Sequence, residues 1–125
     1  MIYDDIAEGY NELHGEEQLD KYMVALPYLD GDTTVLDVGS GTGLLARYTE
    51  ANVVGVEPSQ EMASQGRYDN YRVYVESASF ISSFEENSFD VVTSFTAAHH
   101  FTEPANVFKA ISVCLKHGGI LVCSL

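Results

Sequence analysis

A cluster of glycines directly after a short apolar run is the feature that most constrains this chain. Residues 34–38 are rich in β-branched side chains, and residues 39–43 follow with the sequence Gly-Ser-Gly-Thr-Gly. A short apolar run bounded by turn residues predicts a buried strand, and residues 44–50 have the pattern of a short helix. A strand that turns through glycines into a helix lets a ligand approach the backbone, because no Cβ intrudes there. The sequence therefore predicts an α/β fold with a ligand site where this first strand ends.

The rest of the chain alternates between strand patterns and helix patterns. Further strands are expected at residues 52–57, 71–76, 89–95 and 120–125. Helices are expected at residues 3–28, 59–66 and 103–116, with Ser59 as an N-cap and Pro104 in a first turn. Residues 80–88 are expected to form a loop. Strands that alternate with helices predict a parallel sheet with right-handed crossovers.

Two acidic residues accompany the glycines and narrow the class of ligand. Glu57 ends the second strand, eighteen residues after Gly39, where a carboxylate can accept hydrogen bonds from both hydroxyls of an adenosine ribose. The nicotinamide fingerprint has the spacing Gly-x-Gly-x-x-Gly, whereas this chain has Leu44 in place of the last glycine. Asp37 lies two residues before the first glycine. An anion at that position suits a cofactor with ammonium and sulfonium groups better than one with a pyrophosphate.

Several segments together resemble class I S-adenosylmethionine-dependent methyltransferases, in the branch that contains quinone-biosynthesis and related small-molecule enzymes. The similar segments, in chain order, are residues 3–10, 35–43, 56–62, 84–92, 98–101 and 115–121. The second of these looks like motif I of that family. The resemblance covers nearly the whole chain. It implies a Rossmann-like three-layer sandwich with a mostly parallel sheet of strand order 3-2-1-4-5, lacking the C-terminal antiparallel hairpin of the full family fold.

The resemblance also implies roles for residues that match the family's motifs. Glu57 would hold the ribose of S-adenosylmethionine, and Pro58 and Met62 would pack on its adenine. Ser77-Ala78 stands where the family often has Asp-Ala, and this serine is a departure that weakens a contact with the adenine amino group. The residues expected to bind the methionine end are Asp37, Gly39, Ser40, Gly41 and Gly43.

Residues outside these motifs keep two interpretations each. Tyr3 and Tyr10 have helical spacing, so they are either core or part of a lid whose rings meet the sulfonium. His99 and His100 follow the fourth strand, where one could act as a general base, or one caps the loop while the other packs inward. Ser94 is expected in the floor beneath the reactive methyl group. We expect one domain over residues 1–125, with a helical lid at 1–30 and an α/β core at 31–125.

Composition limits the partners and the compartment. The net charge of −13 repels phosphate backbones, so nucleic acid is disfavoured as a substrate. No stretch has the length of a membrane-spanning helix, and the acidic N-terminus is unlike a signal peptide, so we expect a cytoplasmic protein. Cys114 and Cys123 are expected to be buried, reduced thiols. No cluster of ligand residues indicates a metal site.

The leading prediction is methyl transfer from S-adenosylmethionine to a small-molecule acceptor. The alternative is a cofactor-binding module that needs a partner or a missing C-terminal segment to form the acceptor pocket. A dehydrogenase is a distant third. The fifth strand would be an exposed apolar edge, which a partner or a second copy could cover in a homodimer. A trimmed domain or a natural minimal form would also account for such an edge.

Overall fold

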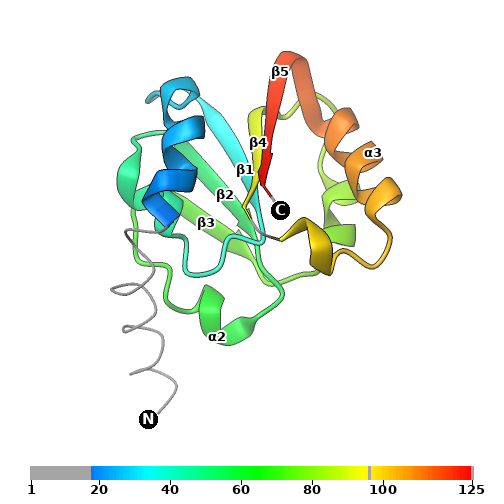
Figure 1. Ribbon diagram of the computed structural model, residues 1–125, viewed down its shortest axis with the longest axis horizontal. Coiled ribbons are helices and arrows are strands. Elements are labelled where there is room, and N and C mark those ends of the chain that lie inside the picture. The colour runs from blue at the N-terminus through cyan, green and yellow to red at the C-terminus, as the bar shows by residue number, and fades with distance from the viewer. Residues whose placement is uncertain (1–17, 96, 125) are drawn as a thin grey trace.

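The computed structural model of this 125-residue chain describes residues 18–95 and 97–124. A five-stranded sheet forms its centre, and every strand pairing in it is parallel (Figure 1). The strands are β1 (Thr34–Val38), β2 (Asn52–Val56), β3 (Tyr71–Tyr74), β4 (Phe89–Phe95) and β5 (Leu115–Ser124). Their order across the sheet is β3-β2-β1-β4-β5. The predicted α/β fold and strand order are confirmed.

Helical segments cover both faces of the sheet and make three layers. A helix at residues 18–25 continues into the 3₁₀ turn η1 (Leu26–Tyr28) on one face, together with η2 (Leu44–Tyr48). The other face carries η3 (Ala78–Ser83) and α3 (Pro104–Cys114). Two short elements, α2 (Gln60–Ala63) and η4 (Ala98–His100), lie at the carboxyl ends of the strands (Figure 1).

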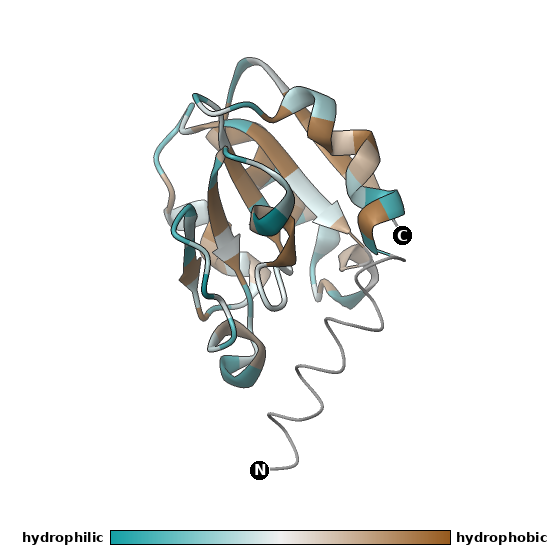
Figure 2. Ribbon diagram, turned by 90° about the vertical axis from the view of Figure 1, so that its left-hand side faces the viewer, coloured by the Kyte–Doolittle hydropathy of each residue, from teal (hydrophilic) through white to brown (hydrophobic). Residues whose placement is uncertain are grey.

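Alternation along the strands divides the apolar residues between two cores. Val35 of β1 packs with the helix at residues 18–25, whereas Leu36 and Val38 pack with α3. Successive side chains of a strand point to opposite faces, so a sheet covered on both sides needs apolar residues at nearly every position. The strands are accordingly mainly brown, or apolar, in Figure 2.

Two expected elements are wrong in their details. The short helix expected at residues 44–50 is present as the 3₁₀ helix η2, which ends earlier, at Tyr48. The segment 80–88, expected to be a loop, contributes to η3, because Ile81 is buried in the core and anchors a 3₁₀ turn there. By contrast, the expected cap at Ser59 is confirmed, since its Oγ accepts a hydrogen bond from the Met62 N–H at 3.2 Å.

The last helix ends earlier and the last strand begins earlier than expected. Leu115 pairs with Phe89 and Ile120 pairs with Val91, so residues 116–119 form a bulge opposite one residue of β4. Asp90 is that residue. Its carboxylate accepts a hydrogen bond from the Thr34 N–H at 2.9 Å and contacts Lys116 Nζ at 3.2 Å, which ties the amino ends of β1, β4 and β5 together.

β5 is the last strand of the sheet, and among the described residues it pairs with β4 alone. Its other edge therefore has no strand beside it. Leu121 on this strand is exposed. Association through the edge stays a prediction. Cys114 is buried as expected, but Cys123 is exposed on the same edge strand, which corrects that expectation. Within residues 18–95 and 97–124 no helix is long and apolar enough to span a membrane.

Candidate functional site

The glycine turn crosses the carboxyl end of β1. Gly39, Gly41 and Gly43 have φ angles of 75°, 59° and 78°, a left-handed region that side chains disfavour. A Cβ on Gly39 would lie 2.5 Å from the Cβ of Ala97, the second residue after β4. The Gly39 N–H donates to the carbonyl of Val56 at 2.8 Å. The turn is therefore held closely between the ends of β2 and β4.

Glu57 fixes this turn from the end of β2. Its Oε1 accepts a hydrogen bond from the Gly41 N–H at 2.8 Å, and its Oε2 accepts one from the Ser59 N–H at 2.9 Å. The residue is only 8% exposed. A carboxylate oxygen can accept a second hydrogen bond, so both oxygens keep the capacity to bind ligand hydroxyls.

Asp37 is the second acid of the site, and it is almost completely buried. Its Oδ1 accepts a hydrogen bond from Thr93 Oγ1 of β4 at 2.8 Å. Burial raises the pKa of Asp37 to about 7; the Thr93 hydrogen bond lowers this pKa and the nearby Glu57 raises it. From sequence alone, Asp37 is expected to be an anion that suits a cationic cofactor. In the folded chain, its charge near neutral pH instead depends on whether a cation lies beside it.

A cavity of about 850 Å³ opens beside these two acids. Enclosed ligand sites have volumes of roughly 300–1,000 Å³, so a cofactor of nucleoside size fits. The cavity brings together most of the predicted residues: Asp37, Gly39, Ser40, Gly41, Glu57, Pro58, Met62, Ser77, Ala78 and His100. The first and last of these residues, Asp37 of β1 and His100 of η4, are 63 positions apart in the sequence. This arrangement is the main support for one shared site.

Some predicted residues do not line the cavity or fall outside the described part. Gly43 is absent from the lining, because it backs onto the ring of Tyr71. Ser94 is also absent from it; its buried Oγ has no hydrogen-bond partner among the described residues. The side chain of His99 lies outside the described residues, as do Tyr3 and Tyr10, and with them most of the predicted lid.

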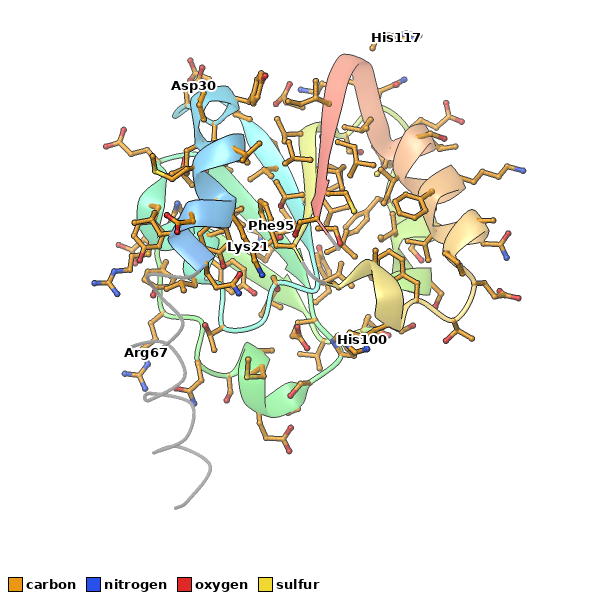
Figure 3. All side chains as sticks on the ribbon, in the orientation of Figure 1. Lys21, Asp30, Arg67, Phe95, His100 and His117 are labelled. Carbon is orange, nitrogen blue, oxygen red and sulfur yellow. The ribbon has the colours of Figure 1, made fainter. Side chains whose placement is uncertain are left out.

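The structure adds cavity residues that sequence reasoning missed. Tyr22, from the helix at residues 18–25, lines the cavity with its ring 5.0 Å from that of Phe95. Its helical spacing indicates core, and a buried aromatic can both pack and face a cavity. Figure 3 labels Phe95, the last residue of β4, and His100, the last residue of η4. Glu103 and Asn106 line the far side, where Asn106 Nδ2 donates to Glu103 Oε2 at 3.0 Å.

Comparison with known proteins identifies the family. A family model described as a methyltransferase domain matches residues 36–123. The match begins inside β1, includes the glycine turn and the strands β2, β3 and β4, and ends one residue before the end of β5. The matched domain and the strand order are those of class I S-adenosylmethionine-dependent methyltransferases. This chain belongs to the methyltransferase domain family.

Individual relatives agree with this assignment. The chain is 31% identical over 124 residues to an uncharacterised protein of Methanocaldococcus jannaschii, covering 96% of this chain and 48% of that protein. It is 34% identical over 105 residues to 2-methyl-6-phytyl-1,4-hydroquinone methyltransferase of a Synechocystis strain, covering 78% of this chain and 33% of the relative. The chain therefore spans half or less of the length of these relatives.

Among solved structures, a methyltransferase in complex with the Haloferax volcanii Trm112 methyltransferase activator has the same fold. The superposition has a TM-score of 0.80 at 24% identity and covers 96% of this chain and 56% of the other. At this identity the likeness concerns the fold alone.

Proposed function

We propose that this chain binds S-adenosylmethionine in the cavity at the carboxyl ends of its strands and transfers the methyl group to a small-molecule acceptor. The observation that carries the proposal is the position of Asp37 and Glu57 in one cavity, together with a turn that has glycine at alternate positions. Among the described residues, a Cβ on Gly41 would have only the Met62 side chain within 4 Å, at 3.6 Å, so the backbone there is open to a ligand. A ligand can approach the turn at this point.

The chemistry of the donor set fits this cofactor. When bound, S-adenosylmethionine supplies a methyl group on a positively charged sulfur. Glu57 would accept hydrogen bonds from the ribose hydroxyls, and Pro58 and Met62 would pack against the adenine. Asp37 would hold the cationic methionine end, where its ionised form is favoured once a positive charge is near.

The residues around the cavity would mainly orient the acceptor. A donor that is already activated needs proximity and alignment, which can contribute up to about 7–11 kcal/mol to the lowering of a barrier. His100 lines the cavity and is the described candidate for removing a proton from the acceptor, where the acceptor needs to lose one. The quinone-related methyltransferase among the relatives supports a small-molecule acceptor.

The alternative is a cofactor-binding module that transfers no methyl group without a partner or a further segment. Two observations support this alternative. The chain spans half or less of its relatives' length. A protein of the same fold was solved with an activator protein.

Calorimetric titration with S-adenosylhomocysteine tests the site. We expect micromolar binding by the parent chain, and binding weakened about tenfold or more by Asp37→Ala and by Glu57→Ala, since hydrogen bonds to charged groups are strong. Glu86→Ala is the control, because it removes the same charge at an exposed position outside the cavity lining. Unchanged affinity in both site variants would refute the assignment.

A second measurement separates the two functions. Transfer of a labelled methyl group to any compound in a screen of small metabolites would support an independent enzyme. Binding of S-adenosylhomocysteine without transfer to any of them would favour the module.

A further inference from the structure

A tyrosine outside the cavity contacts the back of the glycine turn. Tyr71 begins β3, pairs with Val53 of β2 and does not line the cavity. Its phenolic oxygen lies 2.7 Å from Ser40 Oγ, in a hydrogen bond that joins residues 31 positions apart. The side chain of Ser40 is thus engaged by β3.

Three glycines from separate segments surround this tyrosine. A Cβ on Gly43 or on Gly66 would lie 2.5 Å from the ring, and a Cβ on Gly55 would lie 2.6 Å from the hydroxyl oxygen. Contacts this short do not occur for real Cβ atoms, so these three positions need glycine while Tyr71 is present. The ring therefore sets the spacing between the glycine turn, the middle of β2 and the segment after α2.

The hydroxyl of Tyr71 stays protonated, so it can keep its hydrogen bond with Ser40. Burial raises its pKa above the ordinary value for tyrosine, the Ser40 hydrogen bond lowers it, and the charges of Asp37 and Glu57 raise it further. The group therefore remains a neutral hydroxyl at physiological pH. A neutral hydroxyl can donate to Ser40 Oγ or accept from it.

We propose that Tyr71 is a positioning residue for the glycine turn, which it holds through Ser40 in the conformation that receives the cofactor. The turn is then fixed from two sides: Glu57 binds the Gly41 N–H on the cavity side, and Tyr71 binds Ser40 on the opposite side. Tyr71 does not touch the ligand. The inference rests on the proposed function, since it concerns the site of that cofactor.

The experiment is a double-mutant cycle read by two measurements. Tyr71→Phe keeps the ring that the glycines need and removes only the hydroxyl, and Ser40→Ala removes its partner. Affinity for S-adenosylhomocysteine and amide hydrogen exchange of residues 40–43 without ligand are measured for the parent, both single variants and the double variant. Tyr74→Phe is the control, because it removes a hydroxyl from the same strand, where the ring packs on Phe80 and Phe84.

We expect each single variant to weaken affinity about threefold to tenfold, the range of one hydrogen bond, and the double variant to be no weaker than the worse single one. Exchange should be faster at residues 40–43 in these variants, and Tyr74→Phe should match the parent in both measurements. Parent-like affinity and exchange in Tyr71→Phe would overturn the inference. Faster exchange spread evenly over the chain would overturn it as well, because that indicates a general structural role.

The cycle also distinguishes failure of this inference from failure of the proposed function. If the parent does not bind S-adenosylhomocysteine, the proposed cofactor site is wrong. Exchange at residues 40–43 then decides alone whether Tyr71 holds the turn.

Discussion

Two parts of the cavity lining, called here the turn wall and the α3 wall, are held in different ways. The turn wall, residues 37–44 and 56–62, is fixed by hydrogen bonds between distant segments, such as those from Gly41 to Glu57 and between Ser40 and Tyr71. The α3 wall, residues 97–110, carries exposed polar side chains, and its hydrogen bond from Asn106 to Glu103 spans only three positions. A wall fixed by hydrogen bonds between segments that are distant in the sequence suits a ligand that is always the same molecule. A wall of exposed side chains suits selection of a variable acceptor.

A substitution at the point where the two walls meet should have the largest effect. Gly39→Ala places a Cβ against Ala97 and forces a left-handed conformation on alanine, so we expect the free energy of unfolding to fall by about 2–5 kcal/mol. Urea denaturation measures this loss. Gly31→Ala is the control, because no atom of residues 18–95 and 97–124 lies within 4 Å of its Cβ position, and it should change stability little.

A companion variant checks the cause. Adding Ala97→Gly to Gly39→Ala removes the opposing Cβ and should restore part of the stability. If the double variant is no more stable than Gly39→Ala, contact between the walls at this point does not explain the loss.

The pH dependence of Asp37 sharpens the description of the turn wall. Its pKa is raised by burial from 3.8 to about 7 in the folded chain, so the folded state holds a proton that the unfolded state has released in this window. Its contribution to stability is therefore complete below about pH 4 and declines as pH rises toward 7, by about 2–3 kcal/mol between pH 5 and pH 8. Asp37→Asn should remove this decline in urea titrations at several pH values.

The same shift predicts the pH dependence of cofactor affinity. A cation favours the ionised carboxyl, so binding of S-adenosylmethionine should release a proton near neutral pH, and affinity should rise as pH passes through 7. Calorimetry in buffers of different ionisation heat measures the proton. An affinity for S-adenosylmethionine that does not change between pH 6 and pH 8 would contradict the role given to Asp37.

The smallest effect is expected on the α3 wall. Asn106→Ala removes an exposed amide, so we expect stability to change by less than about 0.5 kcal/mol and affinity for S-adenosylhomocysteine to stay the same. Once an acceptor is known, its KM should change in this variant. A loss of cofactor affinity here would mean that the two walls do not differ in the way described.

Local pattern was enough to predict the sheet and much of the turn wall. The strand at residues 89–95, the cap at Ser59 and the acid at Glu57 are each marked by neighbours in sequence, and strand order followed from the resemblance. The contact that excludes a side chain from Gly43 comes from Tyr71, 28 residues later, so no local pattern indicates it.

Properties that depend on packing could not be predicted from the sequence for the same reason. The raised pKa of Asp37 follows from burial by the assembled sheet, and the bulge after Leu115 follows from its register with β4. Cys123 lies in an apolar run, yet an edge strand leaves alternate side chains exposed. The predicted roles of Tyr3, Tyr10 and His99 stay predictions, since they concern positions or side chains outside the described residues.

The two backbone N–H groups that bind Glu57 have a consequence for the entropy of ligand binding. A glutamate side chain loses rotational freedom when a ligand immobilises it, at an entropy cost of up to about 2 kcal/mol. In this chain the rotamer is already restricted before any ligand arrives, because both oxygens are held by the backbone. That entropy is lost during folding, so more of the enthalpy of each new hydrogen bond from a ligand hydroxyl would remain as affinity.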